Sequence, residues 1–314
     1  MSMLRRGSGK SHETSALIAG IAAFTVWGLI PVYWKLLKSV PAMEIIAHRV
    51  IWTALFLVIL LTWQRRWAEV KTTARSLRVM LYCIASGSMI AINWLVFIWA
   101  VNVDRIIETS LGYFMTPLVN VLFGAILLQE KLTRLQLASV SLGTIAVLNL
   151  TFAYGRFPWV ALALCISFGL YGLLRKQSGT AAIPGLFIET VVLVPVAIVY
   201  LLLQSSGTLM FGRAGSSLSI LLMSTGIVTA VPLFWFGYAT RHLRLITIGF
   251  LQYLAPTGAL FIGIFLYHEP FTAGHLVTFS LIWIGLAIFT GEAVMRWRSA
   301  RIRDALAESV CEPV

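Results

Sequence analysis

The chain is organised as long apolar stretches separated by short polar segments. About 20 apolar residues in a helix cross the roughly 30 Å hydrocarbon core of a bilayer. Such stretches must be helical, because lipid offers the backbone no hydrogen-bond partner. The pattern predicts an all-α polytopic membrane protein with ten transmembrane helices: Ala16–Leu37, Met43–Trp63, Leu77–Ala100, Arg105–Leu128, Arg134–Phe152, Phe157–Leu174, Ile183–Gln204, Leu218–Thr240, Arg244–Tyr267 and Thr272–Met295.

The composition supports a membrane protein and changes how the charge is interpreted. The chain is 59% hydrophobic and 11% charged, whereas soluble domains are about 45–50% apolar and about 25% charged. The mean hydropathy is +0.88. The formal net charge of +12 would suggest nucleic-acid binding in a soluble chain. Among apolar stretches of this length, the bilayer explains the basic excess better, and nucleic acid is excluded as a partner.

The positive charges between the spans predict the orientation. If the N-terminus is cytoplasmic, 18 of the 24 Lys and Arg residues lie on the cytoplasmic side, 5 lie on the outer side, and Arg49 lies within the second span. Loops rich in Lys and Arg stay in the cytoplasm. Both termini are therefore expected there.

The two halves of the chain contain a repeat with a spacing of 139 residues. In the fourth and fifth spans the matched positions are Arg105, Pro117, Gly124, Glu130 and Thr133, which correspond to Arg244, Pro256, Gly263, Glu269 and Thr272. Each half has five spans, and an odd number places the second half upside down relative to the first. Inverted repeats are the architecture of secondary transporters. The predicted organisation is a tail (1–15), two five-helix repeats (16–152 and 157–296) and a second tail (297–314).

Several motifs resemble one transporter family. The run WGLIPVYWKLLKSVPAMEIIAHR, from Trp27 to Arg49, is similar to the start of the RarD-type, chloramphenicol-sensitivity permeases in the EamA branch of the drug/metabolite transporter superfamily. The segments GLFIET at 185–190, QYLAPT at 252–257 and HEP at 268–270 support this resemblance, which covers residues 16 to 296. It implies a ten-helix permease of the bacterial inner membrane and says little about the cargo.

Three polar residues open the second span and are candidates for the substrate site. Glu44 and His48 share a helix face, and Arg49 lies about 9 Å deep at 1.5 Å per residue. In one interpretation Arg49 faces a central cavity, where it holds an anionic group or serves as the counter-charge of Glu189. In the other, Glu44 pairs with His48 or Lys35 in an interfacial network and Arg49 extends to the membrane surface.

Glu189 lies about six residues into the seventh span, entered from the cytoplasmic side. Burial there suits a proton carrier. The alternative is a protonated acid that makes a structural hydrogen bond to a neighbouring helix.

Matched prolines lie in the middle of the fourth and ninth predicted spans. A proline leaves the carbonyl four residues earlier without its helical partner, and matched interruptions in inverted halves indicate a transport site. A packing kink without a ligand is the alternative. The candidate cavity wall consists of the two prolines with polar and aromatic neighbours: Pro117, Pro256, Tyr113, Asn120, Gln252, Tyr253, Asn93 and Trp94.

Other motifs are structural in this interpretation. Glu130 and Glu269 end their spans in turns, and Thr133 and Thr272 are expected N-caps of the helices that follow. The small-residue pairs Ser139/Gly143 and Ala287/Gly291 permit close helix packing, within a monomer or in a homodimer.

The sequence thus predicts a secondary transporter, not an enzyme, that moves a small organic metabolite or drug-like molecule by alternating access. A proton or substrate gradient would drive it. The alternatives are a channel-like facilitator and, with less support, an intramembrane enzyme, for which no catalytic set assembles at one depth. No cofactor or metal motif occurs in the sequence, and the partners expected are the substrate and the lipid bilayer.

Overall fold

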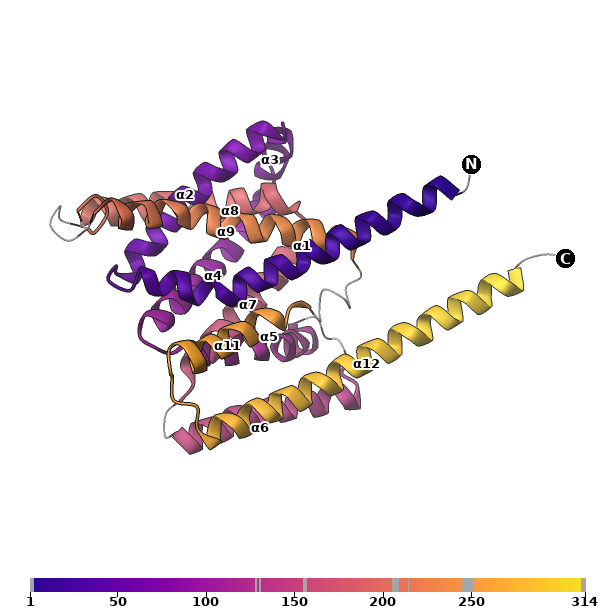
Figure 1. The fold of residues 1–314 in the computed structure, drawn as a ribbon. Helices are drawn as coiled ribbons and strands as arrows, with labels where there is room; N and C mark the ends of the chain where they lie inside the picture. Colours follow the sequence, from indigo (N-terminus) through magenta and orange to yellow (C-terminus); the bar gives the residue numbers. More distant parts are fainter. Residues whose placement is uncertain are drawn as a thin grey trace. The chain divides into compact units, whose positions relative to one another are not determined.

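The computed structural model describes residues 3–127, 129, 131–154, 157–204, 209–213, 215–243 and 251–311, and these are helical apart from connecting turns and loops (Figure 1). The elements are α1 (Met3–Leu36), α2 (Ala42–Trp63), α3 (Trp67–Ala74), α4 (Leu77–Asn102), α5 (Ile106–Leu127), α6 (Arg134–Tyr154), α7 (Trp159–Ser178), α8 (Ala182–Leu203), α9 (Ser216–His242), α11 (Leu254–Phe261), the π-helical turn η1 (Ile262–Leu266) and α12 (Ala273–Cys311).

Eight of the described helices are long and apolar enough to cross a membrane. They correspond to eight of the ten predicted spans. The other two contain shorter apolar helices, Trp159–Arg175 and Leu254–Leu266. The predicted ends Leu128 and Arg244, together with Glu130, lie outside the described residues. The all-helical fold class is confirmed for the described part of the chain, and the division into ten spans stays a prediction.

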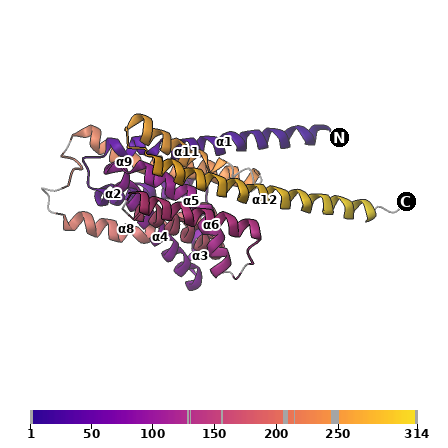
Figure 2. The same cartoon turned by 90° about the horizontal axis from the view of Figure 1, so that it is seen from below.

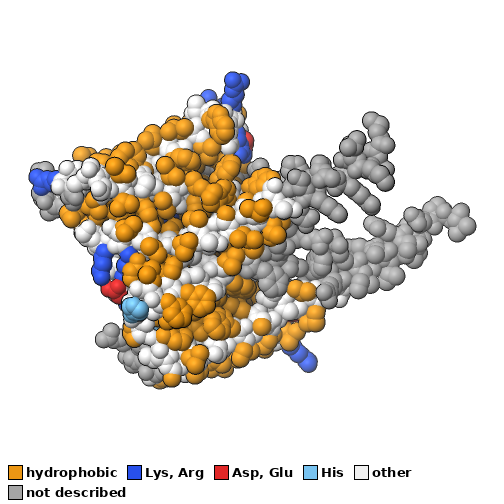
Figure 3. All heavy atoms as spheres, viewed as in Figure 1, with side chains coloured by type: hydrophobic (Ala, Val, Ile, Leu, Met, Phe, Trp, Pro, Cys, Tyr) orange, Lys and Arg blue, Asp and Glu red, His pale blue; other side chains and the backbone are white. Residues whose placement is uncertain are grey.

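The distribution of side chains is the reverse of that in a soluble domain. Large apolar side chains such as Trp63, Phe152 and Leu203 are exposed on the outer surface, while Thr53, Ser86 and other polar groups are buried. Hydrophobic side chains cover most of the described surface visible in Figure 3, with charged groups at its margins. A bilayer accounts for this arrangement, because exposed apolar patches of this extent are rare in soluble monomers.

The terminal helices and α3 differ from the sequence-based expectation. α1 already begins at Met3 and α12 continues to Cys311, so segments expected as tails have helical backbone. α3 lies between α2 and α4, where only a basic loop was expected. Its Trp67 packs edge-on against Phe187 of α8, with ring centroids 5.3 Å apart.

The structure divides into two compact units, residues 1–113 with 159–270 and residues 114–158 with 271–314. Each unit takes segments from both halves of the sequence. In the first unit α1 packs along α9, α2 along α8, and α4 along α7.

The paired helices of the first unit run antiparallel. Along α1, Phe24 contacts Phe236 with ring centroids 5.8 Å apart, whereas Tyr33 donates a hydrogen bond to the carbonyl of Leu221, earlier in α9. Between α4 and α7, Asn93 bonds to Leu164, while the later Trp99 meets the earlier Trp159. The apolar clusters between α2 and α8 follow the same order.

Two glycines bring helices of the first unit into close contact. A Cβ on Gly226 of α9 would lie 2.6 Å from the backbone carbon and oxygen of Trp52 in α2. A Cβ on Gly87 of α4 would lie 3.0 Å from the backbone oxygen of Glu189 in α8. Gly87 and Gly226 are 139 positions apart, which is the spacing of the sequence repeat. Equivalent positions of the two halves thus contact the second span of the other half.

In the second unit α6 runs beside α12 in both views (Figures 1 and 2). Asn149 donates to Thr278 Oγ1 at 3.0 Å, and a Cβ on Gly285 would lie 3.2 Å from the carbonyl of Ser139. Ser139 thus packs within this chain. The expected N-cap Thr133 is confirmed, because its Oγ1 accepts the backbone N–H of Gln136 at 3.2 Å.

Candidate substrate site

Arg49 is held between aromatic rings of two neighbouring helices. Its side chain comes from the second turn of α2, and the residue is 6% exposed. The guanidinium carbon lies 3.8 Å from the ring centre of Trp94 (α4) and 5.2 Å from that of Trp34 (α1). Each cation–π contact contributes about 2 kcal/mol or more when desolvated, and removing a charge from water costs several kcal/mol. The two rings offset much of this cost but accept none of the hydrogen bonds that a buried guanidinium donates.

Arg49 is part of a helix face on which several polar atoms are buried without a hydrogen-bond partner in the described chain. These atoms are Arg49 Nε, His48 Nε2, Trp52 Nε1 and Thr53 Oγ1 on α2, joined by Trp34 Nε1 on α1. Residues three and four positions apart share a helix face, so Arg49, Trp52 and Thr53 are neighbours. Buried polar groups are nearly always hydrogen-bonded. This concentration is therefore what a binding site for a polar ligand requires.

Glu44 and His48 connect α2 to the segment that precedes α9. Glu44 Oε1 accepts the backbone N–H groups of Met210 and Phe211 at 2.9 and 3.1 Å. The His48 ring stacks on Phe211 with centroids 4.6 Å apart. The interpretation in which Glu44 pairs with His48 or Lys35 is wrong, since its carboxylate binds this backbone.

Asn93 holds three helices together next to the Arg49 cluster. Its amide nitrogen donates to the carbonyl of Leu164 and to Ser167 Oγ in α7, each at 3.0 Å. Its amide oxygen accepts the hydroxyl of Tyr113 from α5 at 2.9 Å. The structure thus joins Tyr113 to Asn93, the chain neighbour of Trp94, and Trp94 contacts Arg49.

Glu189 forms an ion pair with a residue that the sequence did not single out. Its Oε2 lies 2.6 Å from Nη1 of Arg175 at the end of α7, and its Oε1 accepts the hydroxyl of Ser86 at 2.6 Å. Glu189 is 1% exposed. Its counter-charge is Arg175, and the interpretation that assigned this role to Arg49 is wrong.

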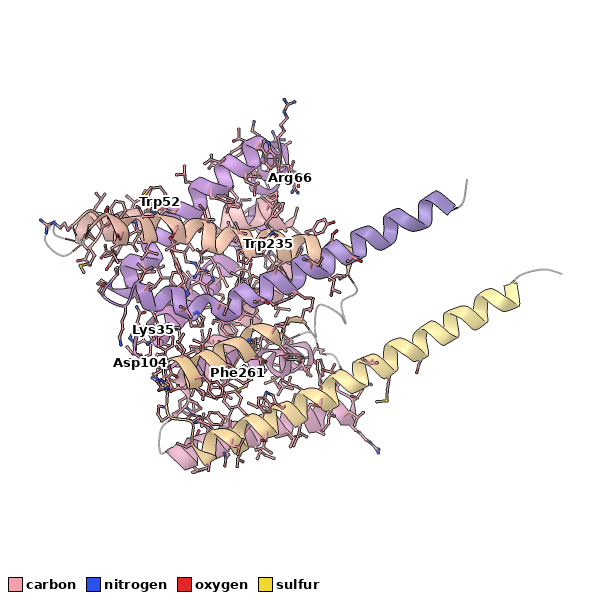
Figure 4. All side chains as sticks on the ribbon, viewed as in Figure 1. Lys35, Trp52, Arg66, Asp104, Trp235 and Phe261 are labelled. Carbon is pink, nitrogen blue, oxygen red and sulfur yellow. The ribbon has the colours of Figure 1, made fainter. Side chains whose placement is uncertain are left out.

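A second charged cluster lies at the C-terminal end of α1. Asp104, between α4 and α5, pairs with Lys35 and with Lys38, the latter at 3.0 Å (Figure 4). These hydrogen bonds, first that of Lys35, lower the pKa of the Asp104 carboxyl below its usual value. Asp104 has a φ of +58°, a left-handed conformation that Asp tolerates better than most residues.

Glu269 caps a helix that is distant in sequence, a role that the sequence did not reveal. Its two carboxylate oxygens accept the N–H groups of Ile106 and Ile107, the first residues of α5, at 2.7 and 2.8 Å. Unpaired N–H groups and the helix dipole favour a negative charge at this position. Burial nevertheless raises the pKa of Glu269.

The remaining candidates lie in other surroundings. Pro117 lies within continuous α5, in the part assigned to the second unit, where Asn120 is exposed. Gln252 and Tyr253 form a half-buried turn before α11, and Pro256 is the third residue of that helix. The backbone N–H that a proline lacks would have no helical partner at this position of α11. Because residues 244–250 lie outside the described residues, the match between two mid-span prolines stays a prediction.

Comparison with known proteins identifies relatives over nearly the whole chain. The chain is 43% identical over 294 residues to the uncharacterized transporter YojE of Bacillus subtilis, covering 92% of this chain and 98% of the relative. It is 42% identical to the protein RarD of Escherichia coli, with the same coverage. The chloramphenicol-sensitive protein RarD of Pseudomonas aeruginosa is 28% identical and matches 91% of this chain and 95% of its own.

A family model and a solved structure agree with these relatives. The EamA-like transporter family model matches residues 14–152. A crystal structure that is 17% identical aligns with a TM-score of 0.57 over 87% of this chain and 96% of its own, which indicates a shared fold. The apolar helices and these relatives define a multi-pass transporter of a bacterial membrane. The chain belongs to the EamA family, and within it to the RarD-type permeases.

Proposed function

We propose that the protein is a secondary transporter that moves a small organic metabolite or drug-like molecule across the bacterial inner membrane by alternating access. The observation that carries the proposal is the pairing of helices between the two halves of the chain. The first span of each half packs on the third span of the other, in the pairs α1–α9 and α4–α7. The second spans pair as α2–α8, and the fifth spans pair as α6–α12. A two-fold relation between the halves would produce these pairs.

The equivalent glycines support the same proposal. Gly87 and Gly226 have matching positions in the two halves, and each touches the backbone of the second span of the other half. Inverted halves can exchange conformations, which opens a shared site to one side at a time. Arg49 with its aromatic neighbours is the proposed site for the substrate.

The proposed orientation, with both termini in the cytoplasm, has a direct test. Lys38 and Arg213 then face outward, and Arg65 and Gly179 face the cytoplasm. Single cysteines at these positions are labelled with an impermeant maleimide in intact spheroplasts. Labelling of the first pair alone supports inverted halves, whereas labelling of Arg65→Cys from outside refutes the orientation.

Transport is tested by counterflow in proteoliposomes that contain the purified protein. A carrier accelerates uptake of labelled substrate when unlabelled substrate is present inside, and its rate saturates. A channel shows flux without saturation or acceleration. Arg49→Gln should abolish counterflow while membrane insertion stays normal. The matched control Arg66→Gln, which loses an exposed pair with Glu69, should transport normally. Unaltered counterflow in Arg49→Gln contradicts the role proposed for Arg49.

A further inference from the structure

The charge of Arg49 is not balanced within the described chain. Arg49 makes no ion pair or hydrogen bond there, and its Nε is buried. Each carboxylate with a described side chain interacts with another group: Glu44, Glu69, Asp104, Glu108, Glu189, Glu269 and Glu292. Buried charges in proteins are paired, because an isolated one is strongly unfavourable. The described residues therefore leave this site short of one negative charge, which a bound anion would supply.

The other unsatisfied atoms around Arg49 are mainly donors. Trp34 Nε1, Trp52 Nε1 and Arg49 Nε can only donate, and Thr53 Oγ1 can donate. An ionised carboxylate is an acceptor with about four lone-pair positions. Such a set of donors favours a carboxylate over an amine or another cation, which would bring donors to donors.

The surroundings of Arg49 also restrict the size of the charge and the shape of the ligand. Lys35, the residue that follows Trp34 in α1, is already paired with Asp104. The charge of Arg49 therefore matches a ligand with one negative charge. The groups in contact with the guanidinium are aromatic: Trp34 and Trp94. Aromatic rings bind flat apolar groups by stacking or edge contacts.

We infer that the substrate of the proposed transporter is an organic anion with a single carboxylate and a flat apolar body. The carboxylate pairs with Arg49, and the body lies against Trp34 and Trp94. This inference rests on the proposed transport function and specifies the chemical class that the same site accepts.

The test measures binding and needs no transport. The purified full-length protein in detergent is heated with benzoate, 3-phenylpropanoate or indole-3-acetate, with the primary amide of each acid, with phenyl phosphate and with nitrate. Because a ligand of the native state raises the apparent Tm, at least one carboxylate should raise it while its amide does not. Phenyl phosphate and nitrate should act more weakly. Arg49→Gln should weaken binding of that carboxylate by about 30-fold or more, and Arg66→Gln should leave it unchanged.

Four results would overturn the inference, and the first three concern the carboxylates. They are the absence of stabilisation by every carboxylate in the set, equal stabilisation by acid and amide, and carboxylate binding that Arg49→Gln leaves intact. Stabilisation by nitrate as strong as that by the acids would assign an inorganic anion and also overturn it. Arg49→Lys, which keeps the charge, controls for misfolding and should retain preference for acid over amide. A carboxylate that binds but shows no counterflow would refute the transport function and leave the anion site standing.

Discussion

Replacement of Gly226 by Ala gives the most direct test of the packing between the two halves of the sequence. The new Cβ would lie 2.6 Å from two backbone atoms of Trp52, whereas ordinary contacts begin at 3.4 Å. The shortfall is about 0.8 Å, and a backbone cannot move aside as a side chain can. Overpacking of this kind costs about 1–3 kcal/mol, and Ala returns up to about 1 kcal/mol through its higher helix propensity. We expect a net loss of about 1–2 kcal/mol.

The equivalent glycine and a third glycine give a graded series. At Gly87 the nearest backbone atom is 3.0 Å from the new Cβ, so the shortfall is about half as large and Gly87→Ala should cost less. Gly237 lies in the same helix as Gly226 and its Cβ would meet nothing within 4 Å, so Gly237→Ala should be neutral or stabilising. The assay is the apparent Tm of the protein in detergent, where 1 kcal/mol corresponds to roughly 2–4 °C in a soluble chain of 150–250 residues. Equal melting of Gly226→Ala and Gly237→Ala would refute the close approach of α2 and α9.

Three further predictions concern the charged clusters. Glu189→Gln should lower the free energy of unfolding by about 3–5 kcal/mol because it leaves Arg175 without its partner. A second change in the same protein, Arg175→Met, should recover part of the loss in apparent Tm. If the losses of the two single variants simply add in the double variant, the two residues are not a coupled pair. Because the pKa of Asp104 is lowered, its ionised form stabilises the native state at pH values above its unfolded pKa of about 3.9, and this stabilisation is lost as the pH falls through the folded pKa. Asp104→Asn should therefore lower the apparent Tm at pH 7 and weaken the dependence of Tm on pH below about 4. Identical Tm profiles of the variant and the unmodified protein would argue against this ion pair. Glu269→Ala should cost about 0.5–2 kcal/mol through loss of the α5 cap, measured against the exposed-pair control Glu69→Ala, and an equal effect of the two would count against the cap.

The sequence predicted the elements that depend on local composition. Apolar runs located the spans because crossing a bilayer requires a fixed length of apolar helix. Thr133 was recognised as an N-cap because the cap and its helix are adjacent in sequence. For Arg49 the sequence left two interpretations open, and the burial of the residue argues against the one in which it extends to the membrane surface.

Contacts between distant segments were the part that the sequence did not reveal. Arg175 was counted only as a positive charge near the membrane surface, yet it pairs with Glu189 of the next helix. Glu269 caps a helix 162 and 163 positions away in sequence. Hydropathy reports the preference of a residue for lipid. The hydrogen-bond or ion-pair partner of a polar side chain depends instead on which helices approach each other in the fold. The repeat held part of that information, since Gly87 and Gly226 share its spacing.

The isolated charge of Arg49 has a kinetic consequence for a carrier of the proposed kind. If the guanidinium stays ionised, the empty protein changes conformation with an unpaired buried cation, whereas the loaded protein does so with a neutral ion pair. Reorientation of the empty carrier would then be the slower half of the transport cycle. Such a protein would exchange substrate molecules across the bilayer faster than it carries out net transport.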